Sequence, residues 1–268
     1  MWMLRILCLF FSVAMMTDDI AFEAPLNEWK LPKSLKEFSG MTILPNGQIA
    51  MVQDEKGVIY FFDPDTGEVV DELKFKKKGD FEGITFLSGH FYVLQSDGHL
   101  FEVNATSKQE RSYRLPFDAD NDLEGITSDG RYLYVCPKEN SGLYGAEANN
   151  KIIWRLDPRD FFLPPKAVIS LSKSAYLKNT NKDHWKSIGF SGIAVHPTSG
   201  MFYVLSHRSH EVMVFSPDGE ITTVWSYPKK LLPQAEAITF DHQGHLLIGS
   251  EAGKKKHGRL YRFSIKKR

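Results

Sequence analysis

The sequence is poor in cysteine, with only Cys8 and Cys136 among its 268 residues. Cys8 lies in an N-terminal apolar stretch that export would remove, so we expect no intramolecular disulfide. No histidine lies at zinc-ligand spacing from the remaining cysteine. The sequence also lacks a nucleophile elbow, a phosphate-binding loop and a dinucleotide fingerprint, so it carries none of the short motifs that identify the common enzyme classes.

An excess of charge is missing as well, because 33 Lys and Arg residues balance 33 Asp and Glu residues. This balance gives no reason to expect nucleic acid or an acidic membrane surface as a partner. The chain is 42% hydrophobic and 25% charged, so it can bury an ordinary core. Its aromatic fraction of 13% suits a β-rich fold, since large rings pack well on pleated surfaces.

The one long apolar run lies at the N-terminus. Arg5 precedes about ten apolar residues, and Ser12-Val13-Ala14 forms a small-residue cleavage pattern. We predict that residues 1–16 are a secretory signal peptide or a short membrane anchor; a buried first helix is the remaining interpretation. No later stretch is apolar over a length that spans a bilayer. Residues 22–268 are therefore expected to form the folded domain.

A short pattern recurs along the chain with a period in the low forties, apart from one longer interval between the third and fourth copies. The five copies are Glu37–Met41, Asp80–Ile84, Asp122–Ile126, Gly189–Ile193 and Gln234–Ile238. Each copy begins a first strand, which is followed by a turn, a dense apolar strand, a polar loop and a third strand. A period of this size is typical of one four-stranded propeller blade.

The repeats predict an all-β fold, a five-bladed β-propeller. The fifth repeat ends at Arg268 without a fourth strand, which would leave an open sheet edge. The segment Leu26–Pro32 resembles the fourth strands, so we predict that this N-terminal strand closes the ring. The long interval carries extra residues at 140–150 and 172–187. We interpret them as two long loops, with a six-bladed ring containing one degenerate blade as the alternative.

Aligning the repeats places oxygen-bearing side chains at one position, at the start of each innermost strand: Ser39, Glu82, Glu124, Ser191 and Glu236. These strand starts converge on the central channel of a propeller. Three carboxylates brought together there repel one another unless a cation compensates them. Calcium prefers six to eight oxygen ligands, and the lack of His and Cys at these positions disfavours zinc and copper. We therefore predict a Ca²⁺ site; the alternative is that these residues only bond backbone amides at strand starts.

The loops between second and third strands are expected on the same face as the predicted ring, because the first strand runs away from the ring and the second runs back. Five polar residues from these loops are candidates for a ligand-binding face: Asp54, Lys138, His207, Arg208 and Glu251. The alternative interpretation is that they are ordinary solvated loop residues.

The blade-start phrases resemble those of a known family. Phe38–Met41, Phe81–Ile84, Leu123–Ile126 and Phe190–Pro197 are similar to the SdiA-regulated (YjiK-like) family of bacterial proteins, over about residues 28–263 of this chain. The resemblance implies a five-bladed propeller with calcium in its channel and an N-terminal export or membrane segment. It also implies a distant relation to NHL-repeat proteins.

The order Ser, Glu, Glu, Ser, Glu also resembles the calcium ligands of the calcium-activated nucleotidases (apyrases), which are likewise five-bladed. This second resemblance implies metal binding by the same five residues. The surrounding sequence departs from the apyrase pattern, so nucleotidase activity is not implied.

Two hypotheses for function follow. The first is a non-catalytic binding or scaffold module of the bacterial cell envelope, periplasmic, secreted or membrane-anchored, whose face recognises a small molecule, a glycan or an envelope protein. The second is a calcium-dependent hydrolase of phosphate esters, anhydrides or lactones. There Lys138 and Arg208 would hold an anion, and Glu251, Asp54 or His207 would carry a proton. No nucleophile–base pair is visible in the sequence, which favours the binding module.

Overall fold

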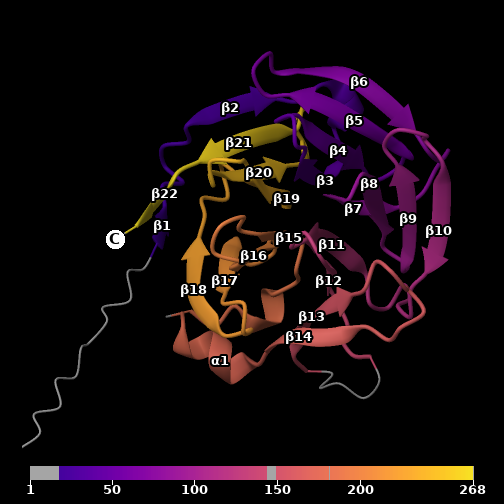
Figure 1. Cartoon of the computed structure of the whole chain (residues 1–268). Coiled ribbons are helices and arrows are strands. Elements are labelled where there is room, and N and C mark those ends of the chain that lie inside the picture. The colour runs from indigo at the N-terminus through magenta and orange to yellow at the C-terminus, as the bar shows by residue number, and fades with distance from the viewer. Residues whose placement is uncertain (1–17, 144–148, 181, 268) are drawn as a thin grey trace, which may run out of the picture.

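The computed structural model describes residues 18–143, 149–180 and 182–267. In this part of the chain, five four-stranded antiparallel sheets surround a central axis (Figure 1), and β1 (Asp18–Ile20) pairs with β22 (Ile265–Lys267) as a separate two-stranded sheet. The prediction of an all-β, five-bladed propeller is confirmed. The six-bladed alternative is wrong, because the described residues of the long interval between the third and fourth repeats form no sheet beyond the five blades.

The strands of each blade follow one another in sequence from the axis outward, except in blade 5. Blade 1 contains β3 (Phe38–Ile43), β4 (Ile49–Gln53), β5 (Val58–Asp63) and β6 (Glu68–Lys74). Blade 2 contains β7 (Phe81–Leu87), β8 (His90–Gln95), β9 (His99–Asn104) and β10 (Glu110–Arg114). Blade 3 contains β11 (Leu123–Ser128), β12 (Leu133–Pro137), β13 (Lys151–Leu156) and β14 (Lys166–Leu171).

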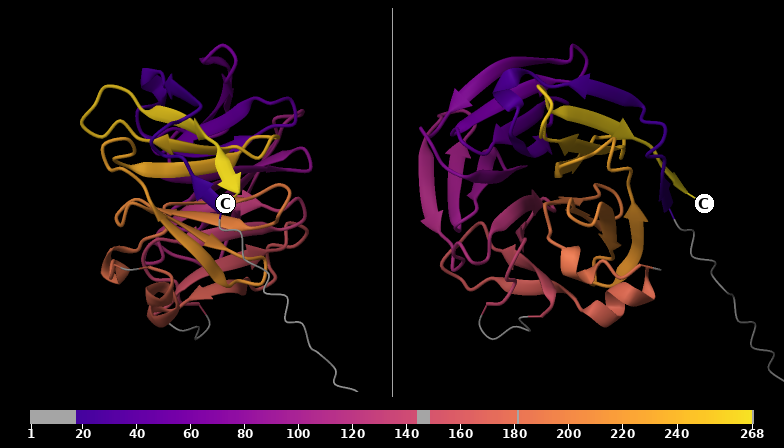
Figure 2. Two further views of the ribbon diagram at one scale, coloured as in Figure 1. Left: turned by 90° about the vertical axis from the view of Figure 1, so that its left-hand side faces the viewer. Right: turned by 180° about the vertical axis from the view of Figure 1, so that it is seen from behind.

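Blades 4 and 5 complete the ring. Blade 4 contains β15 (Gly192–Val195), β16 (Phe202–Ser206), β17 (Glu211–Phe215) and β18 (Ile221–Ser226). Blade 5 contains β19 (Ala235–Phe240), β20 (Leu246–Ser250), β21 (Arg259–Phe263) and the N-terminal strand β2 (Asn27–Lys30). Loops between strands gather on two opposite faces of the ring (Figure 2).

The N-terminal strand β2 lies antiparallel to β21, with Trp29 opposite Leu260. Its indole also contacts blade 1: the ring lies edge-on to Phe62 at 6.2 Å, and Nε1 donates a hydrogen bond to the Pro64 carbonyl at 3.1 Å. The outer strand of the last blade therefore comes from the beginning of the chain, and it joins blade 5 to blade 1.

The segment between blades 3 and 4 differs from the plain loop predicted for residues 172–187. It contains a short helix α1 (Lys173–Lys178), capped by the Ser172 side chain, and the 3₁₀ turn η2 (Trp185–Ser187). The Tyr176 hydroxyl donates to the buried Glu211 carboxylate at 3.0 Å, which fixes the helix to blade 4. A helix of six residues is too short to produce a visible hydrophobic period.

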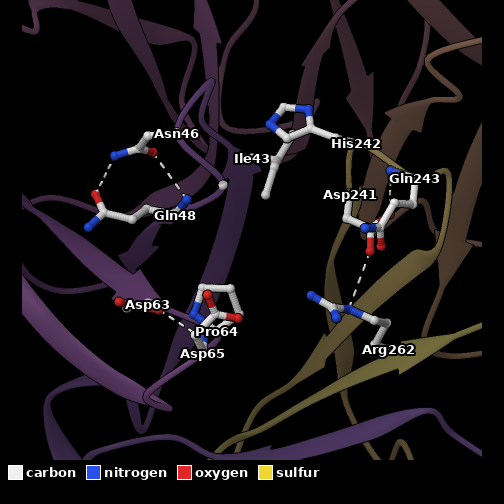
Figure 3. Close-up of a pocket in the computed structure, with 11 residues that line it drawn as sticks. Ile43, Asn46, Gln48, Asp63, Pro64, Asp65, Asp241, His242, Gln243 and Arg262 are labelled. Carbon is white, nitrogen blue, oxygen red and sulfur yellow. Dashed lines mark hydrogen bonds and ion pairs between the residues drawn. The ribbon is translucent and has the colours of Figure 1, made fainter.

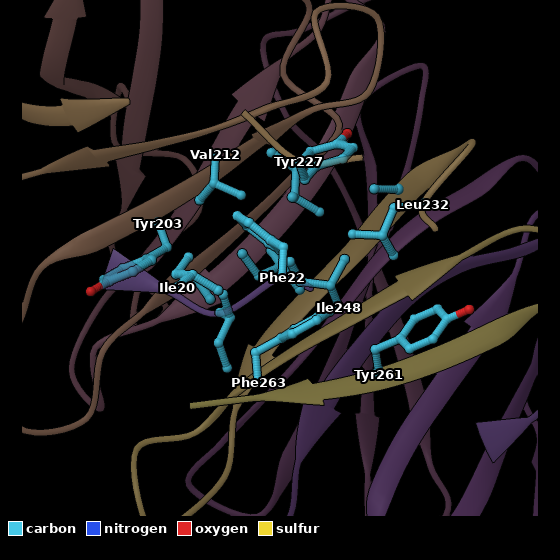
Figure 4. Packing of buried hydrophobic residues seen from close by; sticks show 14 of the residues in the cluster. Ile20, Phe22, Tyr203, Val212, Tyr227, Leu232, Ile248, Tyr261 and Phe263 are labelled. Carbon is cyan, nitrogen blue, oxygen red and sulfur yellow. The ribbon is translucent and has the colours of Figure 1, made fainter. Parts of the chain in front are cut away.

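The core consists of five apolar clusters, one between each pair of neighbouring blades. The cluster between blades 4 and 5 also receives Ile20 from β1 and Phe22 from the segment after it (Figure 4). Phe22 packs against Phe263 and Tyr227, with ring centroids 5.3 and 6.0 Å apart. Each blade is held by its two neighbours, so an open ring would expose two of these apolar faces to water.

The innermost strands approach one another so closely at the axis that most have no room for a side chain. A Cβ atom added to Gly40 would lie 2.7 Å from the Gly83 Cα, and one added to Gly192 would lie 2.6 Å from the Glu236 carbonyl oxygen. Gly125 is equally confined, with the Gly192 Cα at 3.1 Å. The small residue that follows each predicted ligand is thus required by contact between backbones.

Gly40→Ala is therefore expected to lower the free energy of unfolding by about 1–3 kcal/mol, because the new methyl group overpacks a contact between two backbones. Denaturant unfolding of both proteins measures this. As the matched control, Ala237→Gly changes the equivalent position of blade 5 in the opposite direction and should cost only about 0.5–1 kcal/mol through backbone entropy. A Gly40→Ala protein as stable as the parent would contradict the close approach.

Candidate metal centre in the central channel

The predicted ligands are aimed into the channel by β-bulges. The pairing between first and second strands skips one residue in four blades, and the skipped residues are Ser39, Glu82, Glu124 and Glu236. A bulged residue is left out of the ladder, so its side chain is redirected from the regular alternation. Ser191 immediately precedes β15 and lies outside the ladder in the same way. The fold therefore supplies a physical reason why these positions differ from the rest of each strand.

Four of the five predicted ligands line one small cavity on the axis. Ser39, Glu82, Glu124 and Glu236 surround a volume of about 10 Å³, which is enough for one water-sized sphere. Ser191 is not among the lining residues, and blade 4 contributes Gly192 and Ile193 instead. We call these five positions the channel ring, and the face on which they lie the ring face.

The two serines of the channel ring link neighbouring blades. The Ser39 hydroxyl donates to the Phe81 carbonyl at 2.5 Å, and the Ser191 hydroxyl donates to the Ala235 carbonyl at 2.9 Å. Each carbonyl belongs to the residue just before the glutamate of the next blade. The oxygen lone pairs remain as acceptors, and that of Ser191 receives the His207 backbone N–H at 3.2 Å.

The three carboxylates are buried close to one another, which disfavours their charged forms. Burial, followed by the charges of Glu124, Asp80 and Glu236, raises the pKa of Glu82 to about 10. Burial raises the pKa of Glu124 to about 7, against the opposing charge of Lys138. Burial and then the neighbouring Glu251 raise the pKa of Glu236 to about 9. Without a cation, the channel ring therefore carries protons at neutral pH.

Lys138, predicted for the ligand-binding face, provides a cation in this structure. Its ammonium pairs with Glu124 Oε1 and lies 3.7 Å from Asp122 Oδ2. The side chain is only 16% exposed, so the pair is held largely away from water. Burial lowers the pKa of Lys138 and the Glu124 carboxylate raises it, with a net rise.

Two more of the face residues lie beside Glu236. His207 Nδ1 is 3.7 Å from Glu236 Oε1, and this buried nitrogen has no hydrogen-bond partner in the described structure. Burial lowers the pKa of His207 to about 4, so the imidazole is neutral at pH 7. Glu251 accepts a hydrogen bond from Gln234 Nε2 at 2.9 Å, and burial raises its pKa.

The remaining two face residues lie further out. Burial and then the charges of Glu37 and Glu251 raise the pKa of Asp54 to about 6, and its Oδ1 is buried without a hydrogen-bond partner among the described residues. Arg208 pairs with Glu139. All five face residues thus lie on the loops of the ring face, three of them beside channel-ring carboxylates.

A second set of acidic residues was not identified from the sequence. Glu37, Asp80 and Asp122 precede the ligands of blades 1, 2 and 3 by two residues, and they add negative charge around the channel mouth. Their common offset in the repeat alignment is the signal that would have found them. The pairing of Lys138 with the ring had no such signal, because it depends on the path of one loop.

The donor set fits a hard cation, but the carboxylates are not gathered into a ready cluster. Within residues 18–143, 149–180 and 182–267, no group of three or more His, Cys, Asp or Glu side chains lies close enough to hold a metal ion. The donors are oxygen atoms, the composition that calcium prefers, and they border a cavity of ion size.

Fold and channel together define a five-bladed β-propeller with an acidic axial site. The family model described as SdiA-regulated matches residues 17–254, so the chain belongs to the SdiA-regulated family. No curated protein matches the sequence.

Among solved structures, glutaminyl cyclase from Myxococcus xanthus is similar, with a TM-score of 0.61 and 12% identity over 91% of this chain and 97% of that one. A streptogramin B lyase has a TM-score of 0.51 and 11% identity, covering 90% of this chain and 97% of its own. At these identities the likeness shows the fold alone.

The raised pKa values give a pH dependence of stability in the metal-free protein. Glu82 and Glu236 have pKa values of about 10 and 9, above the 4.5 of an exposed glutamate. The folded state therefore holds protons that the unfolded state releases above pH 4.5, and stability is lost as pH rises toward 9 or 10. We expect the melting temperature of chelator-treated protein to fall between pH 5 and pH 9.

Glu82→Gln should reduce this slope, because it removes one of the titrating groups, whereas the exposed control Glu68→Gln should leave it unchanged. A melting temperature that rises over the same range in the parent protein would show that the ring carboxylates are not buried together.

Proposed function

We propose that the protein is an exported or membrane-anchored calcium-binding propeller that acts as a binding or scaffold module in the cell envelope. The observation that carries the proposal is the convergence of Ser39, Glu82, Glu124 and Glu236 on one axial cavity of about 10 Å³. Each of these residues comes from a different blade, so one ion held there would join four of the five blades directly.

The charge of the channel ring is the physical reason for a divalent ion. Three buried carboxylates cost free energy when ionised without compensation. Calcium would supply two positive charges at their centre. Glu82, Glu124, Glu236 and Ser39 would hold it, and Ser191 would support the ring through its bond to blade 5. The Ser39 hydroxyl can donate a lone pair to the ion and still donate its hydrogen bond to the Phe81 carbonyl of the next blade.

Lys138 has two roles in this proposal. In the metal-free ring it neutralises Glu124. When calcium takes over that charge, the ammonium becomes available at the ring face beside Arg208 and the neutral His207. The face then presents cationic and hydrogen-bonding groups above the channel. A small molecule, a glycan or an envelope protein that carries an anionic group is the ligand that this surface suits.

The cellular location rests on the sequence. Residues 1–16, predicted as a signal peptide or anchor, lie outside the described residues. In the described part of the chain no helix is long and apolar enough to cross a membrane. Fractionation of cells that express the full chain, with N-terminal sequencing of the product, distinguishes a cleaved signal from a retained anchor.

Calcium is expected to raise the melting temperature of the purified protein. An ion present at a hundred times its dissociation constant stabilises a fold by about 2.7 kcal/mol, which for a domain of this size corresponds to about 5–10 °C. Metal analysis of the mature protein, with melting curves before and after chelation, measures both occupancy and effect. A metal-free preparation that calcium does not stabilise would contradict the proposal.

Glu82→Gln is the sharpest variant for this site, because no hydrogen bond joins the Glu82 carboxylate to another described residue. Without calcium the substitution replaces a protonated side chain by a neutral one of the same shape, so the melting temperature should be retained near pH 5 and should exceed that of the parent at neutral pH, where folding no longer requires the uptake of a proton. With calcium the gain in melting temperature should shrink, since one ligand charge is lost. Glu68→Gln on the outer strand of blade 1 should leave both values unchanged.

The non-catalytic part of the proposal is tested by turnover. The protein with calcium is assayed against phosphate monoesters, nucleotides and lactones, in parallel with Glu124→Gln. We expect no hydrolysis above the uncatalysed rate. Calcium-dependent hydrolysis that is lost in Glu124→Gln would replace the scaffold by a metal-dependent hydrolase.

A further inference from the structure

The channel has a second polar layer on the side opposite the channel ring. Three residues after each ring position the repeats read Thr42, Thr85, Thr127, Ala194 and Thr239. All five line a cavity of about 370 Å³ at the other mouth of the channel, which we call the vestibule. Between ring and vestibule the intervening position is apolar in every blade, so an apolar layer separates the two; its residues are Met41, Ile84, Ile126, Ile193 and Ile238.

The threonine hydroxyls have no hydrogen-bond partner within the part of the chain that the structure describes. Thr42, Thr85 and Thr239 are only 8%, 4% and 8% exposed, yet among the described residues no hydrogen bond joins any of the four threonine hydroxyls to another group. Nor is any of these oxygens sealed from solvent. Because a hydroxyl on a largely buried side chain still needs a hydrogen-bond partner, these hydroxyls bond to whatever fills the vestibule, either water or a ligand.

The charged residues of the vestibule are already occupied. Asp129 accepts hydrogen bonds from the backbone of Arg131 and Tyr132 and from the Tyr134 hydroxyl at 2.7 Å. Asp241 accepts from the backbone N–H groups of Gln243 and His245, and its other oxygen lies 2.9 Å from His245 Nδ1 and 3.3 Å from Arg262 Nε. The groups left available are neutral hydroxyls, which disfavours a strongly ionic ligand.

The vestibule also has an aromatic wall. Phe86 and Phe240 line it beside the threonines, and the His196 ring lies edge-on to Phe240 with centroids 4.8 Å apart. A column of water molecules would satisfy the hydroxyls but would gain nothing from these rings. A molecule with many hydroxyls and polarised C–H faces would use both, since aromatic faces attract weakly positive C–H groups.

A polar pocket of about 310 Å³ adjoins the vestibule at the seam between blades 1 and 5, and Ile43, Asp241 and His242 line both cavities. Figure 3 shows Asn46 and Gln48 on one wall and Gln243 with Arg262 on the other. The Asn46 amide nitrogen donates a hydrogen bond to the Gln48 side-chain oxygen at 2.9 Å. The two cavities together offer more room than one sugar ring needs.

We propose that the vestibule is a binding site for a neutral saccharide, with the threonine hydroxyls bonding its hydroxyl groups and the half-buried Phe86 contacting its C–H faces. The adjoining pocket accepts a second sugar unit. This site lies on the face opposite the channel ring. The saccharide proposal therefore does not depend on the calcium proposal, and the two can be tested separately.

Ligand-observed NMR and calorimetry of the full chain with neutral monosaccharides and disaccharides, at up to about 10 mM, test the site directly. The probes are glucose, galactose, mannose, N-acetylglucosamine and disaccharides of each. We expect at least one to bind, with a disaccharide binding more tightly than its monosaccharide. Failure of the whole panel to bind would overturn the proposal.

Variants then place the bound sugar. Thr85→Val keeps the shape and removes one hydroxyl, so affinity should fall about two- to tenfold, while Thr85→Ser keeps the hydroxyl and most of the affinity. The combined Thr42→Val and Thr239→Val protein should lose nearly all binding. Thr223→Val makes the same change on the outer strand of blade 4 and should bind as the parent does.

Melting curves of each variant show whether it is folded. If the valine variants do not fold, the Thr85→Ser protein still tests the site, because it keeps the hydroxyl and should keep most of the affinity for the sugar. Sugar binding that survives the threonine variants, or that is lost in Glu82→Gln instead, would place the ligand elsewhere and overturn the assignment of the vestibule.

Discussion

The close approach of the five inner strands at the axis is the constraint on which the rest of the structure depends. Most positions that follow the ring residues must be glycine, because a Cβ atom would meet the backbone of the next blade. The same approach brings three carboxylates around a cavity of ion size, where burial and mutual repulsion raise their pKa values. Closing the propeller thus creates an electrostatic problem at its centre. Lys138 compensates one of the three carboxylates, and the proposed calcium ion would add two positive charges.

The β-bulges confine the buried carboxylates to one position at the start of their inner strands. By leaving the ring residue out of the ladder, a bulge turns one side chain into the channel while the following residues return to regular pairing. The channel is consequently layered: acidic ring, glycine contacts, an apolar layer and then threonines. The two mouths of one channel therefore differ in chemistry, with charged groups at one end and neutral hydroxyls at the other.

The N-terminal segment completes blade 5 at the junction between blades 5 and 1. Strand β2 supplies the outer strand of blade 5, and its Trp29 reaches across to blade 1. Phe22, just before it in the chain, fills the apolar space between blades 4 and 5. The first described segment of the chain thus participates in two of the five interfaces between blades. The polar pocket at the seam exists because blades 1 and 5 meet there through turns rather than through a continuous apolar layer.

The repeat period determined much of this protein from sequence alone. The recurrence of one phrase favoured five blades over six and predicted the aligned ring positions and the face of the second-to-third-strand loops, because every blade repeats the same strand order. The repeat period could not predict contacts that depend on the distances between blades. The pairing of Lys138 with Glu124, the placement of Ser191 behind the ring and the anchoring of helix α1 by Glu211 each join segments far apart in the chain. Only the closed ring sets those distances, and with them the burial that decides which carboxylates hold protons and which hydroxyls are left without a partner.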